Sequence, residues 1–153
     1  MTPVFVFRSL MGEALPLDNA GETSRDFIFV EDMARGLMAC ARSGEAGEVY
    51  NLASGRETTI RDLAETINRI TGNNAPVELR PARDWDASGR RFGDPEKARS
   101  KLGFEAQVSI ADGIARTVEW TRANLELIIG CMSQHAAFVP EVSRYLGRAA
   151  YVG

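Results

Sequence analysis

Histidine and cysteine are scarce in this chain, and this limits the chemistry that it can carry. Among 153 residues there is one histidine, His135, and there are two cysteines, Cys40 and Cys131. The cysteines fall on separate expected helices without the spacing of metal ligands. We therefore expect no metal site and two buried free thiols, which suit a reducing cytoplasm. His135 has no acid or nucleophile near it in the sequence, which makes it a poor catalytic candidate.

Long apolar runs and an excess of positive charge are also lacking. No apolar run approaches the roughly 18–20 residues that span a bilayer, and the first residues lack the basic and apolar regions of a secretion signal. The net charge is -3 and the pI is about 5.3, which disfavours nucleic acid and anionic membranes as general partners. We therefore expect a cytoplasmic protein.

Composition and patterning predict one globular domain of mixed α/β structure. Hydrophobic residues make up 44% of the chain and charged residues 25%, an ordinary balance for a soluble protein. Helices are expected to begin near residues 2, 31, 60, 96 and 110, and strands are expected at 26–30, 49–53 and 77–79. Residues 4–7 (VFVF) suit a strand as well as a helix, so the type of the first element stays open.

Two of the expected helices carry clear signals. The third begins with a capping box of Thr59 and Asp62, and Gly72 stops it. Its apolar positions follow helical spacing: Ile60, Leu63, Ala64, Ile67 and Ile70. The second opens on two acidic residues at 31–32, which suit the positive end of a helix dipole, and carries an apolar side made of Met33, Leu37, Met38 and Ala41.

Four sequence motifs are informative because of the order in which they occur. They are RDFIFVED (25–32), VYNLASG (49–55), RDWD (83–86) and GDPEKARSKLGF (93–104). This set resembles the C-terminal half of the extended short-chain dehydrogenase/reductases, the NAD-dependent nucleotide-sugar epimerases and dehydratases typified by UDP-glucose/galactose 4-epimerase. The resemblance spans roughly residues 2–125.

The resemblance implies an α/β fold that is only the C-terminal portion of such an enzyme. Helices would pack on a few short strands, with most of the Rossmann sheet absent. A nucleotide-sugar-binding domain would occupy residues 1–130, and residues 131–153 would form a tail for which the family offers no counterpart.

By the same resemblance, three residues hold the substrate. Arg25 and Arg83 would contact the diphosphate, and Asp86 would accept hydrogen bonds from the ribose hydroxyls. Arginine suits this task because its planar guanidinium can donate two N–H bonds to phosphate oxygens. Trp85 stands where many relatives have a small residue, which puts the shape of this loop in doubt. The alternatives are a surface Arg25–Asp26 neighbour pair and a charged surface loop.

Arg90 and Arg91 add two cations after this loop. They either strengthen anion binding or form a solvated charged face, and the sequence favours neither interpretation.

The family's catalytic apparatus is missing from this sequence. A glycine-rich turn after the first strand, which would approach the cofactor pyrophosphate, does not occur. No tyrosine is followed four residues later by lysine: Tyr50 and Tyr145 are followed by Ser54 and Ala149. We therefore expect no catalytic or cofactor-binding residue in this chain, and NAD only in a complete family enzyme.

These observations leave two main functional hypotheses. The first is the nucleotide-diphosphate-sugar-binding portion of an NAD-dependent epimerase or dehydratase, a truncated product that is inactive alone. The second is a non-enzymatic oligomerisation or interaction module that retains only the scaffold. An independent enzyme that uses Cys131 or His135 is a third, weaker alternative.

Self-association is expected under either main hypothesis. A strand at 49–53 and the Met33–Met38 side of the second helix are apolar segments of the kind that a large sheet would cover. The expected partner is another copy of the chain or a missing N-terminal Rossmann half.

Overall fold

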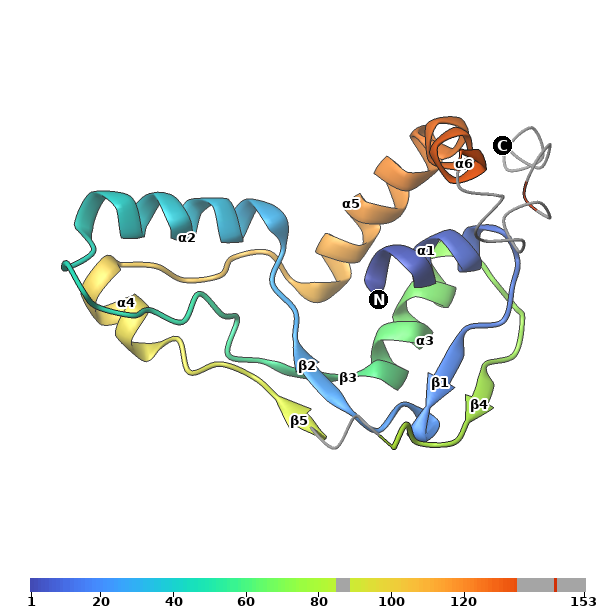
Figure 1. Cartoon of the computed structure of the whole chain (residues 1–153), viewed down its shortest axis with the longest axis horizontal. Coiled ribbons are helices and arrows are strands. Elements are labelled where there is room, and N and C mark those ends of the chain that lie inside the picture. The colour runs from blue at the N-terminus through green and yellow to red at the C-terminus, as the bar shows by residue number, and fades with distance from the viewer. Residues whose placement is uncertain (85–88, 135–144, 146–153) are drawn as a thin grey trace.

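The computed structural model describes residues 1–84, 89–134 and 145. Figure 1 shows a cluster of helices at one end of the molecule, formed by α1, α3 and α5, and a second group at the other end, formed by α2 and α4. Short strands lie along the bottom of this view. The helices are α1 (Thr2–Leu10), α2 (Val30–Ser43), α3 (Ile60–Thr71), α4 (Glu96–Leu102), α5 (Ile110–Ala123) and α6 (Leu125–Ser133).

The hydrophobic core lies between α1, α3, α5 and α6. Val6 of α1 and Ile67 of α3 are completely buried, and Leu63 is 1% exposed. The open question at residues 4–7 is thus settled in favour of a helix, because α1 turns three consecutive residues, Phe5 to Phe7, into this core. The helix begins at Thr2 without a side-chain cap.

The capping signals predicted both ends of α3 correctly. Thr59 Oγ1 accepts a hydrogen bond from the Asp62 N–H at 3.0 Å, and Gly72 ends α3 in the left-handed conformation with φ of 75°. Ser109 Oγ caps α5 in the same way, accepting from the Asp112 N–H at 3.1 Å. The segment after residue 110 forms two helices, α5 and α6, with Asn124 between them.

The strands form two small sheets. Strand β1 (Pro16–Asp18) pairs in parallel with β4 (Glu78–Arg80). In the other sheet, β2 (Ser24–Asp26) lies between β3 (Glu57–Thr59), which is antiparallel to it, and β5 (Arg90–Arg91), which is parallel. The strand expected at 26–30 is therefore displaced to 24–26, and that expected at 77–79 is displaced by one residue.

The strand expected at 49–53 is wrong. This segment has no regular structure, and Val49 is 77% exposed. A strand needs a neighbour to pair its backbone N–H and C=O groups, and the two sheets of the described residues place none beside it. Its apolar residues alone could not make it a strand.

Helix α2 forms as predicted, but its apolar side is largely uncovered. Leu37 is 59% exposed and Met38 is 51% exposed. The buried residues of α2 are Asp32 and Gly36. The expectation of two buried thiols is also wrong, since Cys40 on α2 is half-buried and Cys131 on α6 is exposed. Among the described residues, no helix is long and apolar enough to cross a membrane.

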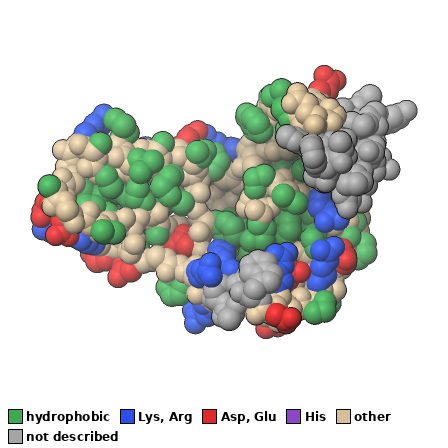
Figure 2. Space-filling model, in the orientation of Figure 1, with side chains coloured by type: hydrophobic (Ala, Val, Ile, Leu, Met, Phe, Trp, Pro, Cys, Tyr) green, Lys and Arg blue, Asp and Glu red, His purple; other side chains and the backbone are tan. Residues whose placement is uncertain are grey.

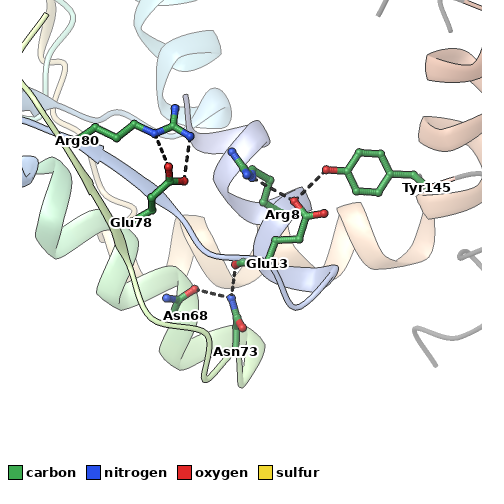
Figure 3. A network of polar contacts seen from close by, with 7 residues as sticks. All are labelled: Arg8, Glu13, Asn68, Asn73, Glu78, Arg80 and Tyr145. Carbon is green, nitrogen blue, oxygen red and sulfur yellow. Dashed lines mark hydrogen bonds and ion pairs between the residues drawn. The ribbon is translucent and has the colours of Figure 1, made fainter. Parts of the chain in front are cut away.

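A polar network joins the end of α1 to α3 and to Tyr145 (Figure 3). The Glu13 carboxylate accepts hydrogen bonds from Arg8 Nε at 3.2 Å and from the Tyr145 hydroxyl at 2.9 Å. The Glu13 carbonyl accepts from Asn73 Nδ2 at 2.9 Å. The Tyr145 ring is 5% exposed and meets Phe7 edge-on, with ring centroids 5.0 Å apart. Tyr145 thus belongs to the core although it is far from α1 in sequence.

A single carboxylate links all three strands of the second sheet. Glu57 of β3 accepts two hydrogen bonds from Arg90 of β5, one of them at 2.6 Å, and a third from the Ser24 hydroxyl of β2. The hydrogen bonds from Arg90 and then from Ser24 lower the pKa of Glu57 from 4.5 to about 2.

Replacing Tyr145 with phenylalanine tests the network. Loss of the hydroxyl should lower the free energy of unfolding by about 1 kcal/mol, because one buried hydrogen bond is lost while the ring contact with Phe7 remains. Tyr145→Ala should lower it by about 3 kcal/mol or more, because the ring leaves a cavity. Urea unfolding measures both, with Tyr50→Phe as the control. Equal stability of Tyr145→Ala and the wild type would contradict this placement.

The Glu57 contacts predict a dependence of stability on pH. Since the folded-state pKa is depressed, the contribution of Glu57 is complete above its usual pKa of 4.5 and is lost as the pH falls towards 2. Glu57→Gln should therefore be less stable than the wild type at pH 6, and this difference should shrink steadily below pH 4.5. Thermal unfolding across this range, with the exposed Glu119→Gln as control, measures the effect. A difference that is constant with pH would contradict the assignment.

Candidate functional site

A cavity of about 600 Å³ opens where the two small sheets meet the start of α1. Val4 and Phe5 of α1 form one wall, and Asp18 at the end of β1 forms another. Arg25 from β2 and Arg83 from the segment after β4 both line the same cavity. The structure thus brings together two of the three site residues that the family resemblance indicated, from segments 58 positions apart in sequence (83 minus 25).

Arg25 is held by backbone carbonyls. Its Nη1 donates to the Ser24 carbonyl at 2.7 Å and to the Gly89 carbonyl at 3.3 Å. Alternate residues of a strand point to opposite faces. Accordingly, Arg25 lines the cavity, while its neighbours Ser24 and Asp26 bond Glu57 and Ser54.

Arg83 forms an ion pair within the cavity wall. Its Nε lies 2.6 Å from Oδ2 of Asp18, and the two side chains are 50% and 31% exposed. Half-exposed ion pairs of this kind contribute little to stability, about 0–1 kcal/mol. The pair therefore holds the guanidinium at the cavity while leaving it open to exchange with another anion.

The structure describes only some of the remaining candidate residues. Asp86, expected at the ribose, and Trp85 lie outside the described residues, as does His135. Arg90 is 70% exposed and pairs with Glu57, which favours a structural role for one of the two cations whose function the sequence left open. Figure 2 shows Lys and Arg side chains gathered on the lower part of this face, over β5 and the β1–β4 pair.

Sequence reasoning missed the turn that follows β1. Asn19 lines the cavity, and both Asn19 and Ala20 adopt the left-handed conformation, with φ of 49° and 54°. Such backbone is strained for residues other than glycine and often occurs at binding sites. The Ala20 carbonyl accepts from Arg61 Nη2 at 2.7 Å, which ties this turn to α3. Residues 18–21 (DNAG) have the composition of a polar turn, and this composition does not indicate a position at the cavity.

Asp26 connects β2 to the segments on either side of it. Its Oδ1 accepts from the Ser54 N–H at 3.0 Å and the Ser54 hydroxyl at 2.6 Å. Its Oδ2 accepts from the Gly55 N–H at 2.9 Å and from the Gly93 N–H at 3.4 Å. This carboxylate therefore bonds backbone groups on both sides of the central strand. Its role is larger than that of a surface neighbour of Arg25.

The arrangement suits anion binding. Two guanidinium groups on one cavity can offer several N–H donors to phosphate oxygens. Among the described residues, no group of three histidine, cysteine or acidic side chains is placed to hold a metal ion.

Comparisons with a family model, with curated relatives and with solved structures indicate the same family. A family model described as GDP-mannose 4,6 dehydratase matches residues 3–117. A dTDP-glucose 4,6-dehydratase of Actinoplanes sp. is 38% identical over 126 residues, which cover 81% of this chain and 39% of that protein.

Two solved structures resemble the fold closely. The Bordetella bronchiseptica enzyme WbmF, in complex with NAD+ and UDP, matches with a TM-score of 0.81 and 54% identity, covering 92% of this chain and 41% of that one. UDP-glucose 4-epimerase of Thermotoga maritima, with UDP-glucose, matches with a TM-score of 0.76 and 34% identity, covering 80% of this chain and 39% of that one.

The chain thus spans about two-fifths of the length of these relatives, with shares of 39% and 41%. Its mixed α/β fold matches part of theirs, as the resemblance implied. The family model covers most of the sequence, from residue 3 to residue 117. The chain belongs to the extended short-chain dehydrogenase/reductase family of nucleotide-sugar epimerases and dehydratases.

Proposed function

We propose that this chain is the nucleotide-diphosphate-sugar-binding portion of an NAD-dependent sugar epimerase or dehydratase. The observation that carries the proposal is the presence of Arg25 and Arg83 on one cavity. The cavity volume of about 600 Å³ lies within the usual range of small-ligand sites, about 300–1,000 Å³. The two arginines would hold the diphosphate, and Asp86 would accept hydrogen bonds from the ribose.

The Arg83–Asp18 pair supports this role. A pyrophosphate carries more charge than one carboxylate and can accept several N–H bonds, so it would compete effectively with Asp18 for the guanidinium. Because the existing pair is half exposed, its exchange for a ligand costs little free energy. Arg25 Nη1 donates to two carbonyl groups, which help to hold its guanidinium at the cavity.

Two relatives indicate the ligand class to test. WbmF was solved with UDP and the Thermotoga maritima epimerase with UDP-glucose. UDP is therefore a suitable probe of the cavity. In the proposed role this chain binds substrate, while NAD and the tyrosine–lysine pair would come from the part of the relatives that it does not match.

Titration of the chain with UDP tests the proposal. Saturable binding is expected in isothermal titration calorimetry. Arg25→Ala and Arg83→Ala should each raise the Kd about tenfold or more, because a hydrogen bond to a charged group contributes about 1.5–3 kcal/mol. The matched control is Arg99→Ala on α4, where the arginine is 52% exposed and paired with Glu96. Its Kd should stay within about twofold of the wild type.

Several results would contradict this function. One is the absence of saturable binding by the wild-type chain. Another is an equal loss of affinity in Arg99→Ala, which would indicate a nonspecific charge effect. Binding should also weaken as salt is raised, because charged groups carry it.

The exposed side of α2 favours a second function, an oligomerisation module. Val30 is 70% exposed, Leu37 59% and Met38 51%, and the nearby Val49 is 77% exposed. Figure 2 shows hydrophobic side chains along this side of α2. A second copy of the chain could cover this surface, as apolar patches of monomers are usually small.

Light scattering tests this second function. At high micromolar concentration the wild-type chain should exceed its monomer mass of 16.7 kDa, because covering apolar side chains is favourable. Leu37→Glu should restore the monomer. The matched control is Leu127→Glu on α6, where leucine is 61% exposed, and it should not. A monomeric wild type at this concentration would rule out self-association through α2.

A further inference from the structure

The sheet that carries Arg25 has very little backbone pairing of its own. Strands β2 and β3 have three residues each and β5 has two. So few residues supply only a handful of ladder hydrogen bonds, and isolated pairs of short strands are marginal in water. The position of Arg25 must therefore depend on additional contacts.

Asp26 supplies contacts of this kind to both neighbouring strands. Ser54 and Gly55, which bond its carboxylate, come just before β3. Gly93, which bonds the same carboxylate, comes just after β5. One side chain thus joins the two outer strands at the same end of the sheet.

Close packing between Gly93 and Ala53 also supports this arrangement. A Cβ atom placed on Gly93 would lie 2.7 Å from the Ala53 Cβ, closer than real Cβ atoms approach. Glycine at 93 thus lets the two segments approach each other and the Asp26 carboxylate. Their contact holds the end of β5 and, because this strand has only two residues, helps to place the Gly89 carbonyl just before it.

The Gly89 carbonyl in turn contacts the cavity arginine. It accepts from Arg25 Nη1 at 3.3 Å, and Arg25 is paired in register with Arg91 of β5. A shift of β5 would therefore move a hydrogen-bond acceptor of the Arg25 guanidinium. Asp26 itself faces away from the cavity, because adjacent residues of a strand point to opposite faces.

We propose that Asp26 is a positioning residue for Arg25. Its carboxylate holds β3 and β5 against β2, and this holds the Arg25 guanidinium where a diphosphate binds. The inference rests on the proposed function for its ligand. It adds to that function a residue that makes no contact with the diphosphate and acts through another side chain.

A double-mutant cycle with UDP as the probe tests the inference. Asp26→Asn replaces a carboxylate oxygen that accepts N–H bonds with an NH₂ group that cannot. It should raise the Kd for UDP about tenfold in the wild-type background, a factor equal to the loss of one charge-assisted contact. In the Arg25→Ala background the same change should alter the Kd less than about twofold, because the affected contact is already gone.

A control variant separates positioning from general stability. Asp32 is 1% exposed and also accepts backbone N–H bonds, from Gln107 at 3.0 Å and Val108 at 2.9 Å, but it is not part of the cavity. Asp32→Asn should lower the melting temperature and leave the Kd for UDP within about twofold of the wild type. If Asp26→Asn does not fold, Ser54→Ala keeps the carboxylate and removes the hydroxyl that donates to Asp26 and accepts from the Arg56 N–H, and it should raise the Kd about two- to threefold.

The nitrogen–proton NMR signal of Arg25 Nε gives a readout without any ligand. It should shift or broaden in Asp26→Asn and stay in place in Asp32→Asn. An unchanged Arg25 signal, or additive effects of Asp26→Asn and Arg25→Ala on the Kd, would overturn the inference while the proposed function stands. If wild-type UDP binding is absent, the proposed function fails, and the NMR signal alone decides whether Asp26 positions Arg25.

Discussion

Two carboxylates on adjacent strands of a small sheet, Glu57 of β3 and Asp26 of β2, hold the site together. Glu57 bonds β2 and β5 from β3, and Asp26 bonds the segments beside β3 and β5 from β2. The strands have only two or three residues, so side-chain acceptors take the place of a longer backbone ladder. Arg25 precedes Asp26 on β2 and is paired in register with Thr58, the residue after Glu57, and the cavity depends on its placement.

The rest of the molecule supports this sheet from one side. Helices α1 and α3 pack together in the core, and α3 begins directly after β3 at Thr59. The Ile60 N–H donates to the Thr23 carbonyl at 2.9 Å, which continues the contact between the start of α3 and the residue before β2. Burial of the α3 apolar side therefore also fixes one wall of the cavity.

The sequence was most informative where a local signal determines structure. The Thr59 cap and Gly72 act within one turn of their own helix, so their effect did not depend on the remainder of the fold. Residues 49–53 were misjudged because a strand depends on a neighbour far away in sequence. Strand β3, with the sequence ETT, was missed because its residues show no apolar alternation. Its pairing with β2 comes from tertiary contacts.

The candidate site also combines residues that the sequence indicated with residues that it did not. Arg25 and Arg83 could be singled out because their motifs resemble those of a known family, and no local rule would have joined them. Asp18 was overlooked because a carboxylate in a polar turn looks like surface, and its approach to Arg83 appears only when β1 and β4 pair. Asp26 was weighed only as a neighbour of Arg25, since its partners lie 28 and 67 positions further along the chain.

The Arg83–Asp18 pair gives the resting cavity a built-in counterion. A monovalent ion such as chloride would gain little by replacing a carboxylate that already neutralises the guanidinium. A pyrophosphate, with more negative charge and more acceptor oxygens, gains more than the carboxylate loses. In the proposed role, this counterion would favour ligands of higher negative charge over monovalent ions.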